Sequence, residues 1–290
     1  MKFHLMLCVP HSKMHGLYGH IEVIESLEWG LKELGHTVTS ALNSFEAEST
    51  NIVFGAQVLP INFLEQLPKN TIIYNFEQMR GLSVEQIRPE VKYYADKFQI
   101  WEYSPCNLPI WESLGTKKIQ LVSVGYAPVL TRIPKPANQC IDVLIYGLTG
   151  SKRLDVFHRL SAAGLKVVFA CGLYGTARDG LISASKIVLN INLYDYSQIF
   201  EIVRVSYLLA NKKAVVGILD PNTYIEPDLL DSVKIATLDN IADCCNGLLE
   251  DEQARSLLEQ KGFNNFLKRD IKNILRTALS IKPCSKIFFE

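Results

Sequence analysis

A pattern of strand, glycine-containing loop, helix and strand occurs twice in this chain and constrains its fold more than any other feature. The first copy starts with a near-continuous apolar run at residues 2–10. It continues into residues 21–34, where apolar side chains recur at helical spacing. The second copy starts with a similar run at residues 141–146. Because strands joined by a crossover helix pair in parallel, we predict an α/β fold with two Rossmann-like domains.

Further apolar runs at the spacing of βαβ units predict the other strands. These runs are residues 51–54, 71–75, 99–103 and 119–123 in the first half, and residues 165–170, 186–193 and 214–217 in the second. Additional helices are expected at residues 154–163, 179–185 and 252–279. Gly35 directly follows the first helix and is expected to end it, because glycine readily adopts the left-handed conformation of a helix C-terminus.

The domain boundary is expected in a proline-rich stretch. Residues 127–138 carry three prolines and no periodicity, which is typical of a linker. The sequence therefore predicts a first domain at residues 1–127, a linker at residues 128–140 and a second domain at residues 141–290. The helical stretch near the end is expected to cover a sheet edge or to cross back to the first domain.

The composition argues against several classes of protein. With 30 basic and 30 acidic residues the formal net charge is zero, which gives no electrostatic case for a nucleic acid as main partner. No apolar run approaches the roughly 18 residues that span a bilayer, and the first residues do not follow a signal-peptide pattern. We expect a cytoplasmic protein and leave peripheral membrane contact open. The seven cysteines lack the spacing of a zinc site, and no convincing DxD-like pair is present, so no metal is expected.

One stretch, residues 194–217, has the composition of a ligand-binding helix. Glu201 and Arg204 lie three residues apart, and either Asp195 or Ser197 is a suitable helix cap ahead of them. The two charged side chains would then occupy the first turns, where the helix dipole favours anions and hydroxyl-rich ligands. The alternative is an intrahelical ion pair on a solvated face.

Two glycine-containing loops are the other main candidates. In the first domain, His20 follows Gly16 and Gly19 and precedes a helix, so a lowered pKa would make it a candidate general base. The alternative is a polar residue beside two conformationally required glycines. In the second domain the loop reads YGLTGSKR, and its Lys152 and Arg153 suit a phosphate group. It matches neither a P-loop nor a GxGxxG fingerprint, and an ordinary turn with a basic helix start is the alternative.

Two further pairs of polar residues lie near the ends of predicted strands. Glu77 and Gln78 lie just past one strand, and Glu102 and Ser104 lie at the end of another. A carboxylate in such a place can orient a substrate hydroxyl. Either pair can instead cap the next helix.

Taken together, these features resemble the GT-B glycosyltransferases. The phrases IIYNFEQ, WEYSPCN, YGTARDGLISASKIVLNINLYD and FEIVRVSYLLANKKAVV are similar to a bacterial branch of the group 1 and CgeB-like glycosyltransferases. The resemblance covers nearly the whole chain. It implies two Rossmann-like domains whose parallel sheets face a central cleft, with the acceptor held by the N-terminal domain and a nucleotide sugar by the C-terminal domain.

The resemblance also implies roles for individual residues. The segment GHIEVIESLEWGLKELGHTV is similar to the first loop and helix of the lipid II N-acetylglucosaminyltransferase, which implicates His20 as a base. The loop YGLTGSKR resembles the loop that meets the donor's diphosphate, which implicates Gly147, Lys152 and Arg153. Residues 200–216 resemble the helix that carries the E-x7-E motif.

The match to that acidic motif is partial. The usual place of its second glutamate falls on Tyr207, so only Glu201 and Arg204 are left to grip the nucleotide or sugar. The resemblance therefore leaves the stereochemical outcome open. In an inverting enzyme His20 would deprotonate the acceptor, and in a retaining enzyme it would position the donor sugar.

The expected function is a metal-independent glycosyltransferase of polysaccharide biosynthesis. It would move a sugar from a nucleoside diphosphate sugar to a glycan, lipid or small-molecule acceptor, without a cofactor. The predicted catalytic residues are His20 and Glu77. The alternatives are a nucleotide-sugar epimerase on the same fold and a non-catalytic protein that binds nucleotides or glycans.

Overall fold

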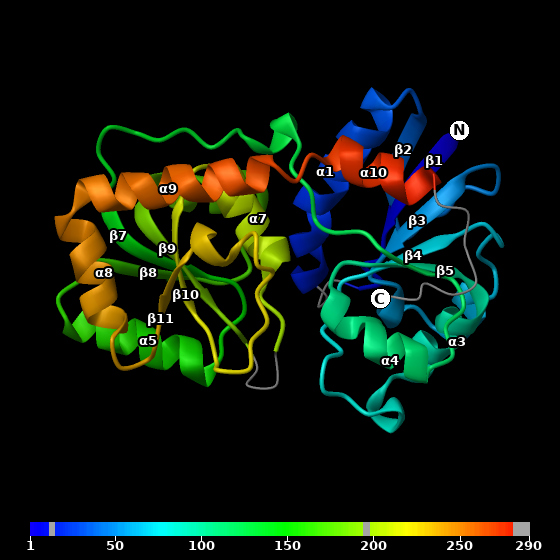
Figure 1. Ribbon diagram of the computed structural model, residues 1–290, viewed down its shortest axis with the longest axis horizontal. Coiled ribbons are helices and arrows are strands. Elements are labelled where there is room, and N and C mark those ends of the chain that lie inside the picture. Colours follow the sequence, from blue (N-terminus) through cyan, green and yellow to red (C-terminus); the bar gives the residue numbers. More distant parts are fainter. Residues whose placement is uncertain (12–14, 194–197, 281–290) are drawn as a thin grey trace. The chain divides into compact units, whose positions relative to one another are not determined.

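The structure is a computed structural model that describes residues 1–11, 15–193 and 198–280. The chain divides into two compact units. Unit 1 comprises Met1–Ala127 together with the described residues that follow Arg269, and unit 2 comprises Pro128–Arg269. Each unit contains one sheet whose strands all pair in parallel (Figure 1). The predicted pair of Rossmann-like halves is therefore confirmed.

Unit 1 is built on a six-stranded sheet in the order β2-β1-β3-β4-β5-β6. Its strands are β1 (Lys2–Leu7), β2 (Thr37–Leu42), β3 (Thr50–Phe54), β4 (Ile72–Asn75), β5 (Gln99–Glu102) and β6 (Ile119–Leu121). The central strands are buried on both faces, which explains their near-continuous apolar sequences.

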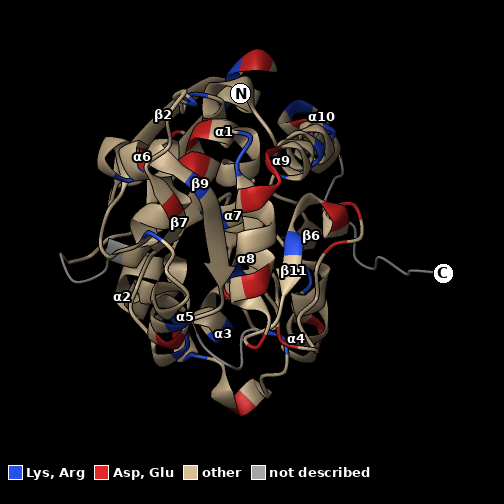
Figure 2. Cartoon of the chain, turned by 90° about the vertical axis from the view of Figure 1, so that its left-hand side faces the viewer, with Lys and Arg blue, Asp and Glu red and all other residues tan. Residues whose placement is uncertain are grey.

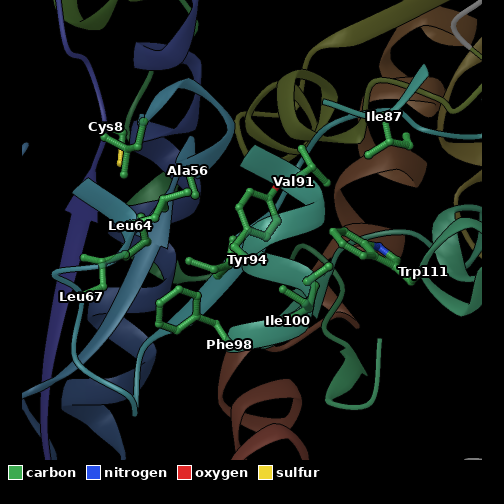
Figure 3. Packing of buried hydrophobic residues seen from close by; sticks show 14 of the residues in the cluster. Cys8, Ala56, Leu64, Leu67, Ile87, Val91, Tyr94, Phe98, Ile100 and Trp111 are labelled. Carbon is green, nitrogen blue, oxygen red and sulfur yellow. The ribbon is translucent and has the colours of Figure 1, made fainter. Parts of the chain in front are cut away.

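The helices of unit 1 cover both faces of its sheet. They are α1 (Ile21–Glu33), α2 (Ile61–Leu64), α3 (Pro89–Lys97), α4 (Leu108–Ser113) and α10 (Ile271–Ser280). Side chains of α2, α3 and α4 pack with the strands in one apolar core, and Figure 3 shows Tyr94 at the middle of that group. Figure 1 shows α1 and α10 on the opposite side of the sheet. The φ of +81° at Gly35 agrees with its predicted place at the end of α1.

The helical stretch at residues 252–279 is two helices in different units. The first, α9 (Glu252–Leu267), belongs to unit 2, and α10 belongs to unit 1. Gly30 of α1 allows the close approach of α10, because a Cβ there would lie 2.8 Å from Leu275 Cδ1 and 2.9 Å from Ile271 Cγ2. Lys272 adds a cation–π contact 5.3 Å from the ring centroid of Trp29. The chain therefore returns to unit 1 by a tightly packed pair of helices.

Unit 2 is built on a five-stranded sheet in the order β11-β10-β9-β7-β8. Its strands are β7 (Ile141–Tyr146), β8 (Val167–Ala170), β9 (Ser185–Ile191), β10 (Ala214–Ile218) and β11 (Lys234–Ala236). No sequence pattern predicts β11, a short edge strand with two exposed residues, because it offers too few buried positions to show a period.

Two layers of helices enclose the sheet of unit 2. The helices are α5 (Ser151–Ala162), α6 (Gly175–Ala184), α7 (Ile202–Ala210), α8 (Ile241–Glu250) and α9. Helices α5 and α8 share an apolar core with one face of the sheet. Helices α7 and α9 pack together and against β10 (Figure 1). Helix α8 is absent from the predicted elements.

Residues 128–140, which the sequence assigns to a linker, are bonded to unit 2. Asn211 lies at the end of α7, and its Oδ1 accepts hydrogen bonds from the backbone N–H groups of Arg132 and Ile133, at 2.8 and 2.7 Å. Its Nδ2 donates to the carbonyl oxygen of Leu130 at 2.9 Å. One buried amide therefore ties the start of the unit to α7.

The strand orders place a topological switch point in each unit. In unit 1 the first strand, β1, lies between β2 and β3, and in unit 2 the first strand, β7, lies between β8 and β9. At a switch point, the loops that follow two adjacent strands leave in opposite directions. A crevice therefore opens at the carboxyl ends of these strands, where ligands of open α/β sheets bind. Across the described residues, no helix is both long and apolar enough to cross a membrane.

Candidate functional site

The switch point of unit 2 carries Gly147 in a conformation that only glycine adopts readily. Gly147 directly follows β7 and has a φ of +122°. A Cβ atom at this position would lie 3.0 Å from Nη1 of Arg153 and 3.0 Å from Nη2 of Arg204. The loop therefore runs against two guanidinium groups, and a side chain at position 147 would displace them.

Arg153 holds this loop to the neighbouring strand. Its side chain is 1% exposed, and its Nε and Nη2 both donate to the carbonyl oxygen of Ile191, at 2.9 and 2.7 Å. Its Nη1 donates to the carbonyl oxygen of Leu148 at 2.8 Å. Burial, and next the charge of Arg204, lower the pKa of Arg153 to about 10, so it stays protonated at neutral pH. Arg153 thus fixes the end of β9 to the loop after β7 and adds a positive charge beneath it.

Arg204 is more accessible and also faces the Gly147 loop. Its Nη1 donates to the carbonyl oxygen of Tyr146 at 3.0 Å, and its guanidinium lies 5.2 Å from the centroid of the Tyr146 ring. Its Nη2 is 3.4 Å from Oε2 of Glu201, and the two side chains are 21% and 16% exposed. Glu201 and Arg204 therefore form an ion pair at a spacing of three residues, as the alternative interpretation predicts. The pair is mostly buried against the loop after β7, however, and does not lie on a solvated face.

Glu201 lies between the two arginines. Its Oε1 is 3.5 Å from Nη2 of Arg153, in addition to the contact of Oε2 with Arg204. Glu201 occupies the N-cap position of α7, where a negative charge is favoured by the helix dipole. Glu201 therefore balances part of the positive charge of the two arginines.

The start of α7 differs from the expectation. The helix begins at Ile202, because residues 198–200 are extended and Ile199 forms a parallel bridge with Tyr224. The proposed capping residues Asp195 and Ser197 lie outside the described residues. The N-cap position belongs instead to Glu201.

Lys152 has a partner that is not among the residues singled out from the sequence, Asp220. Its Nζ donates to both carboxylate oxygens of Asp220, at 2.8 and 3.0 Å. Asp220 comes two residues after the end of β10, and this place just after a buried strand is the signal that points to it. Among the described residues, three basic side chains and two carboxylates lie at this edge of the sheet. These described side chains carry an excess of one positive charge, which suits an anionic ligand.

Tyr207, at the place where the resembled family has its second glutamate, is engaged by neighbouring side chains. Its hydroxyl donates to Oδ2 of Asp179 at 2.7 Å and accepts from Nε of Arg132 at 2.9 Å. The Arg178 guanidinium lies 4.7 Å from its ring centroid. Tyr207 is 1% exposed, so it serves the packing of α7.

In unit 1, His20 lies at the switch point after β1. It ends a short 3-10 helix, η1 (His15–His20), and occupies the N-cap position of α1. The centroid of its ring is 5.2 Å from that of Phe76, and its buried Nδ1 has no hydrogen-bond partner among the described residues. Burial lowers the pKa of His20 to about 4. The imidazole is therefore neutral at physiological pH. From the sequence, a lowered pKa is attributed to the helix N-terminus, whereas burial is the largest cause of the pKa shift in the structure.

Glu77 lies two residues beyond β4, next to Phe76. Nε2 of Gln57 donates to its Oε1 at 2.7 Å. The residue is exposed, yet neighbouring atoms displace enough water to raise the pKa of its carboxyl, against the opposing effect of Arg88. His20 therefore contacts Phe76, the residue that precedes Glu77, and these residues lie at the carboxyl edge of one sheet.

Glu102 anchors the loop that carries Glu77. It is 0% exposed. Its Oε2 accepts from Asn75 Nδ2 at 2.7 Å, and its Oε1 accepts from Asn107 Nδ2 at 3.0 Å. Asn107 Nδ2 also donates to the carbonyl oxygen of Glu77 at 2.8 Å. Burial raises the pKa of Glu102 to about 7. Ser104 caps the next turn by accepting from the N–H of Cys106 at 3.3 Å, as the capping alternative predicts.

Sequence comparison finds no match among protein-family models and none among curated proteins. Solved structures do match. HepE of Anabaena, in complex with UDP and glucose, is 12% identical, with 97% of this chain and 100% of that chain covered and a TM-score of 0.61. BGT of phage T4, in complex with its substrate UDP-glucose, has the same identity and coverage and a TM-score of 0.59.

A third match is an α-glucosyltransferase in complex with UDP and a 13-mer DNA that contains an HMU base. It is 11% identical, covers 96% of this chain and 98% of its own, and has a TM-score of 0.62. The fold is that of the GT-B glycosyltransferases. Identities this low establish the GT-B fold alone, and the resemblance to the CgeB-like branch stays an expectation.

Proposed function

We propose that this GT-B protein transfers a sugar from a nucleoside diphosphate sugar to an acceptor hydroxyl. The observation that carries the proposal is the cationic loop at the switch point of unit 2, where Gly147 meets Arg153 and Arg204. Two solved structures of the same fold, HepE and BGT, hold UDP or UDP-glucose. UDP-glucose is therefore the first donor to test.

The residues of unit 2 are assigned to the donor. Lys152 and Arg204 would contact the diphosphate, while the N-terminus of α5 and the backbone N–H groups of the loop face it. As the bond between the sugar and the diphosphate breaks, its electron pair leaves with the phosphate oxygen. Fixed positive charge stabilises that developing charge without reorganisation. Arg153 contributes its charge from below, and Glu201 holds the two guanidinium groups in place.

The residues of unit 1 are assigned to the acceptor, which we propose to be a glycan, a lipid or a small molecule. In an inverting reaction the neutral His20 would accept the proton of the attacking hydroxyl, and in a retaining one it would position the donor sugar. Glu77 would orient the acceptor hydroxyl as a hydrogen-bond acceptor. Glu102, which holds the loop of Glu77 through Asn107, is a positioning residue.

Several further assignments belong to the proposal. Lys152 and Arg204 supply the positive charge that a metal ion would otherwise provide, so the reaction is proposed to need neither a metal nor a cofactor. Cytoplasmic localisation is supported by the free cysteines of the described part of the chain, which suit a reducing compartment. Acidic and basic residues are interspersed on the elements in view in Figure 2, in line with an acceptor other than nucleic acid.

The proposal is tested by binding first and turnover second. Thermal shifts and calorimetry with UDP, GDP, dTDP and their sugars should identify one nucleotide that raises Tm. Hydrolysis or transfer of the matching sugar, with glycan, lipid, small-molecule and DNA acceptors, then tests catalysis. A panel in which no nucleotide shifts Tm would contradict the proposal. Conversion of the donor without an acceptor would favour an epimerase.

A non-catalytic binding protein is the second candidate. It is favoured by the replacement of the second acidic residue with Tyr207, whose hydroxyl is committed to Asp179 and Arg132. If wild-type protein binds a nucleotide sugar, and His20→Ala and Glu201→Ala leave all measurable turnover unchanged, the binding function is supported. Loss of turnover with retained nucleotide binding supports the enzyme.

A further inference from the structure

Of the two described carboxylates at the carboxyl edge of the unit 2 sheet, Glu201 and Asp220, Asp220 is the more accessible. Its side chain is 39% exposed and that of its partner Lys152 is 12% exposed. The side chain of Glu201, by comparison, is 16% exposed and lies between two arginines. Asp220 therefore has room to accept hydrogen bonds from a ligand in addition to those from Lys152.

The pairing with Lys152 limits what Asp220 can recognise. An ammonium group has three N–H donors, and two of them point at the two carboxylate oxygens of Asp220. The third can donate to a phosphate oxygen. A carboxylate only accepts hydrogen bonds and is repelled by phosphate, so Asp220 needs a ligand group that donates. Next to the diphosphate of a nucleotide sugar, the neighbouring donors are the hydroxyl groups of the ribose on one side and of the transferred sugar on the other.

The loop that starts at Asp220 is held firmly along its first half. The N–H of Thr223 donates to the carbonyl oxygen of Asp220 at 2.9 Å. Tyr224 then pairs with the segment that leads to Glu201: its N–H donates to Gln198 O at 2.8 Å, and its carbonyl accepts from Phe200 N–H at 2.9 Å. These bonds join the loop that starts at Asp220 to the segment before Glu201.

The second half of the same loop is fixed by Arg269. Nε and Nη2 of Arg269 donate to the two carboxylate oxygens of Asp228, at 2.7 and 2.5 Å. Nη2 also donates to Glu226 Oε2 at 2.6 Å. A bidentate, charge-assisted pair of this kind is among the stronger polar contacts. The loop is therefore preorganised, and the Asp220 carboxylate is held in place before any ligand arrives.

From this geometry we propose that Asp220 is a specificity-determining residue that binds hydroxyl groups of the donor's sugar. The inference rests on the proposed function, because it requires a nucleoside diphosphate sugar with its diphosphate at Lys152. Lys152 then has two roles: it contacts the phosphate and it positions Asp220. Glu201 is assigned to the arginines and not to the sugar.

The test compares a nucleotide with and without its sugar. Calorimetry with UDP and UDP-glucose is run on wild type and on Asp220→Asn, or with GDP and GDP-mannose if only the guanosine nucleotide binds. Asparagine keeps an oxygen for Lys152 but loses the charge. We expect the affinity for the nucleotide sugar to fall on the order of tenfold, and the affinity for the nucleotide alone to stay within about twofold.

Two other variants test whether the loss of affinity is due to the position and charge of Asp220. Asp220→Glu keeps the charge but moves it by one methylene, so it should also weaken binding of the nucleotide sugar selectively. Asp231→Asn is the matched control, because the Asp231 side chain is 70% exposed and pairs with Lys261, at 3.0 Å. It should leave both affinities unchanged.

The outcomes separate the inference from the proposed function. Wild-type protein that binds no nucleotide and no nucleotide sugar contradicts the proposed function. Wild-type protein that binds both, with Asp220→Asn weakening both equally or neither, overturns the role of Asp220 alone. Equal weakening would place Asp220 at the ribose or the base.

Discussion

The guanidinium of Arg153 donates two hydrogen bonds to a single carbonyl oxygen, that of Ile191. This contact joins the first helix after β7 to the last residue of β9, across the switch point of unit 2. A buried carbonyl that receives two charge-assisted bonds would be costly to leave unsatisfied. The loop after β7 is also the proposed contact of the donor's phosphate. The stability of unit 2 and the proposed binding of its ligand therefore depend on two neighbouring arginines, Arg153 and Arg204, in different ways.

Replacement of the two arginines should separate these effects. Arg153→Met leaves the carbonyl oxygens of Ile191 and Leu148 without their donors, and we expect a loss of about 3 kcal/mol in the free energy of unfolding. Arg204→Met should cost less than about 1 kcal/mol but weaken nucleotide binding on the order of tenfold. Urea denaturation and calorimetry measure the two quantities. An Arg153→Met protein as stable as wild type would contradict the structural role of Arg153.

Gly147→Ala should damage both the loop and the proposed site. The φ of +122° strains any L-residue, and the new Cβ would lie 3.0 Å from both guanidinium groups. We expect a loss of about 1–3 kcal/mol of stability together with weaker nucleotide binding. Gly164→Ala is the matched control, because Gly164 also has a positive φ, of +82°, but no atom lies within 4 Å of its Cβ position. If the two variants lose equal stability and bind equally, the close approach of the arginines has no effect.

Gly30→Ala should loosen the packing of α10 on unit 1. The added methyl would lie 2.8 Å from Leu275 and 2.9 Å from Ile271, and overpacking of this kind costs about 1–3 kcal/mol. The readout is Tm together with hydrogen exchange of α10. Gly247→Ala is the control in a helix with open space around it, and it should be neutral or stabilising by up to about 1 kcal/mol. Equal effects of both changes would argue against close packing at Gly30.

The lowered pKa of His20 predicts a dependence of stability on pH. Burial lowers this pKa to about 4, whereas an imidazole in the unfolded chain has a pKa of about 6.5. The unfolded chain therefore binds the proton first as the pH falls. The stability that depends on neutral His20 is fully present above about pH 6.5 and is lost as the pH falls toward about 4, by on the order of 3 kcal/mol.

Denaturation curves of wild type and His20→Gln between pH 7 and pH 4 measure this dependence, and the difference between the two proteins should shrink as the pH falls. NMR titration of the imidazole gives the pKa directly. A His20 that titrates near its ordinary value would show that the ring is hydrated, and the predicted slope would disappear.

Chelation tests the assignment of phosphate stabilisation to Lys152 and Arg204. We expect turnover of the donor identified by the binding panel to be unchanged by EDTA, since fixed cations already oppose the developing charge. Lys152→Met should lower kcat/KM under the same conditions. Loss of activity on chelation, restored by a divalent cation, would contradict the metal-independent mechanism.

The sequence by itself determined the helices and strands whose apolar residues recur with a clear period, and the residues beside them. The run at residues 141–146 coincides with β7, because each of its side chains but one is buried and the run ends at a glycine. The helix at residues 21–34 matches α1 to within one residue, since its buried face and the turn at Gly35 are both local signals. Gly147 and His20 stand out for the same reason: they follow recognisable strands.

Only the tertiary structure decided how these residues are used. Lys152 and Arg153 are neighbours with equal charge in the sequence, yet Arg153 is buried under two carbonyl oxygens while Lys152 reaches Asp220. That partner lies on another strand, and no local period reports which strands become adjacent in a sheet. The physical reason is that pairing depends on the order β11-β10-β9-β7-β8, which is set by packing of both faces at once.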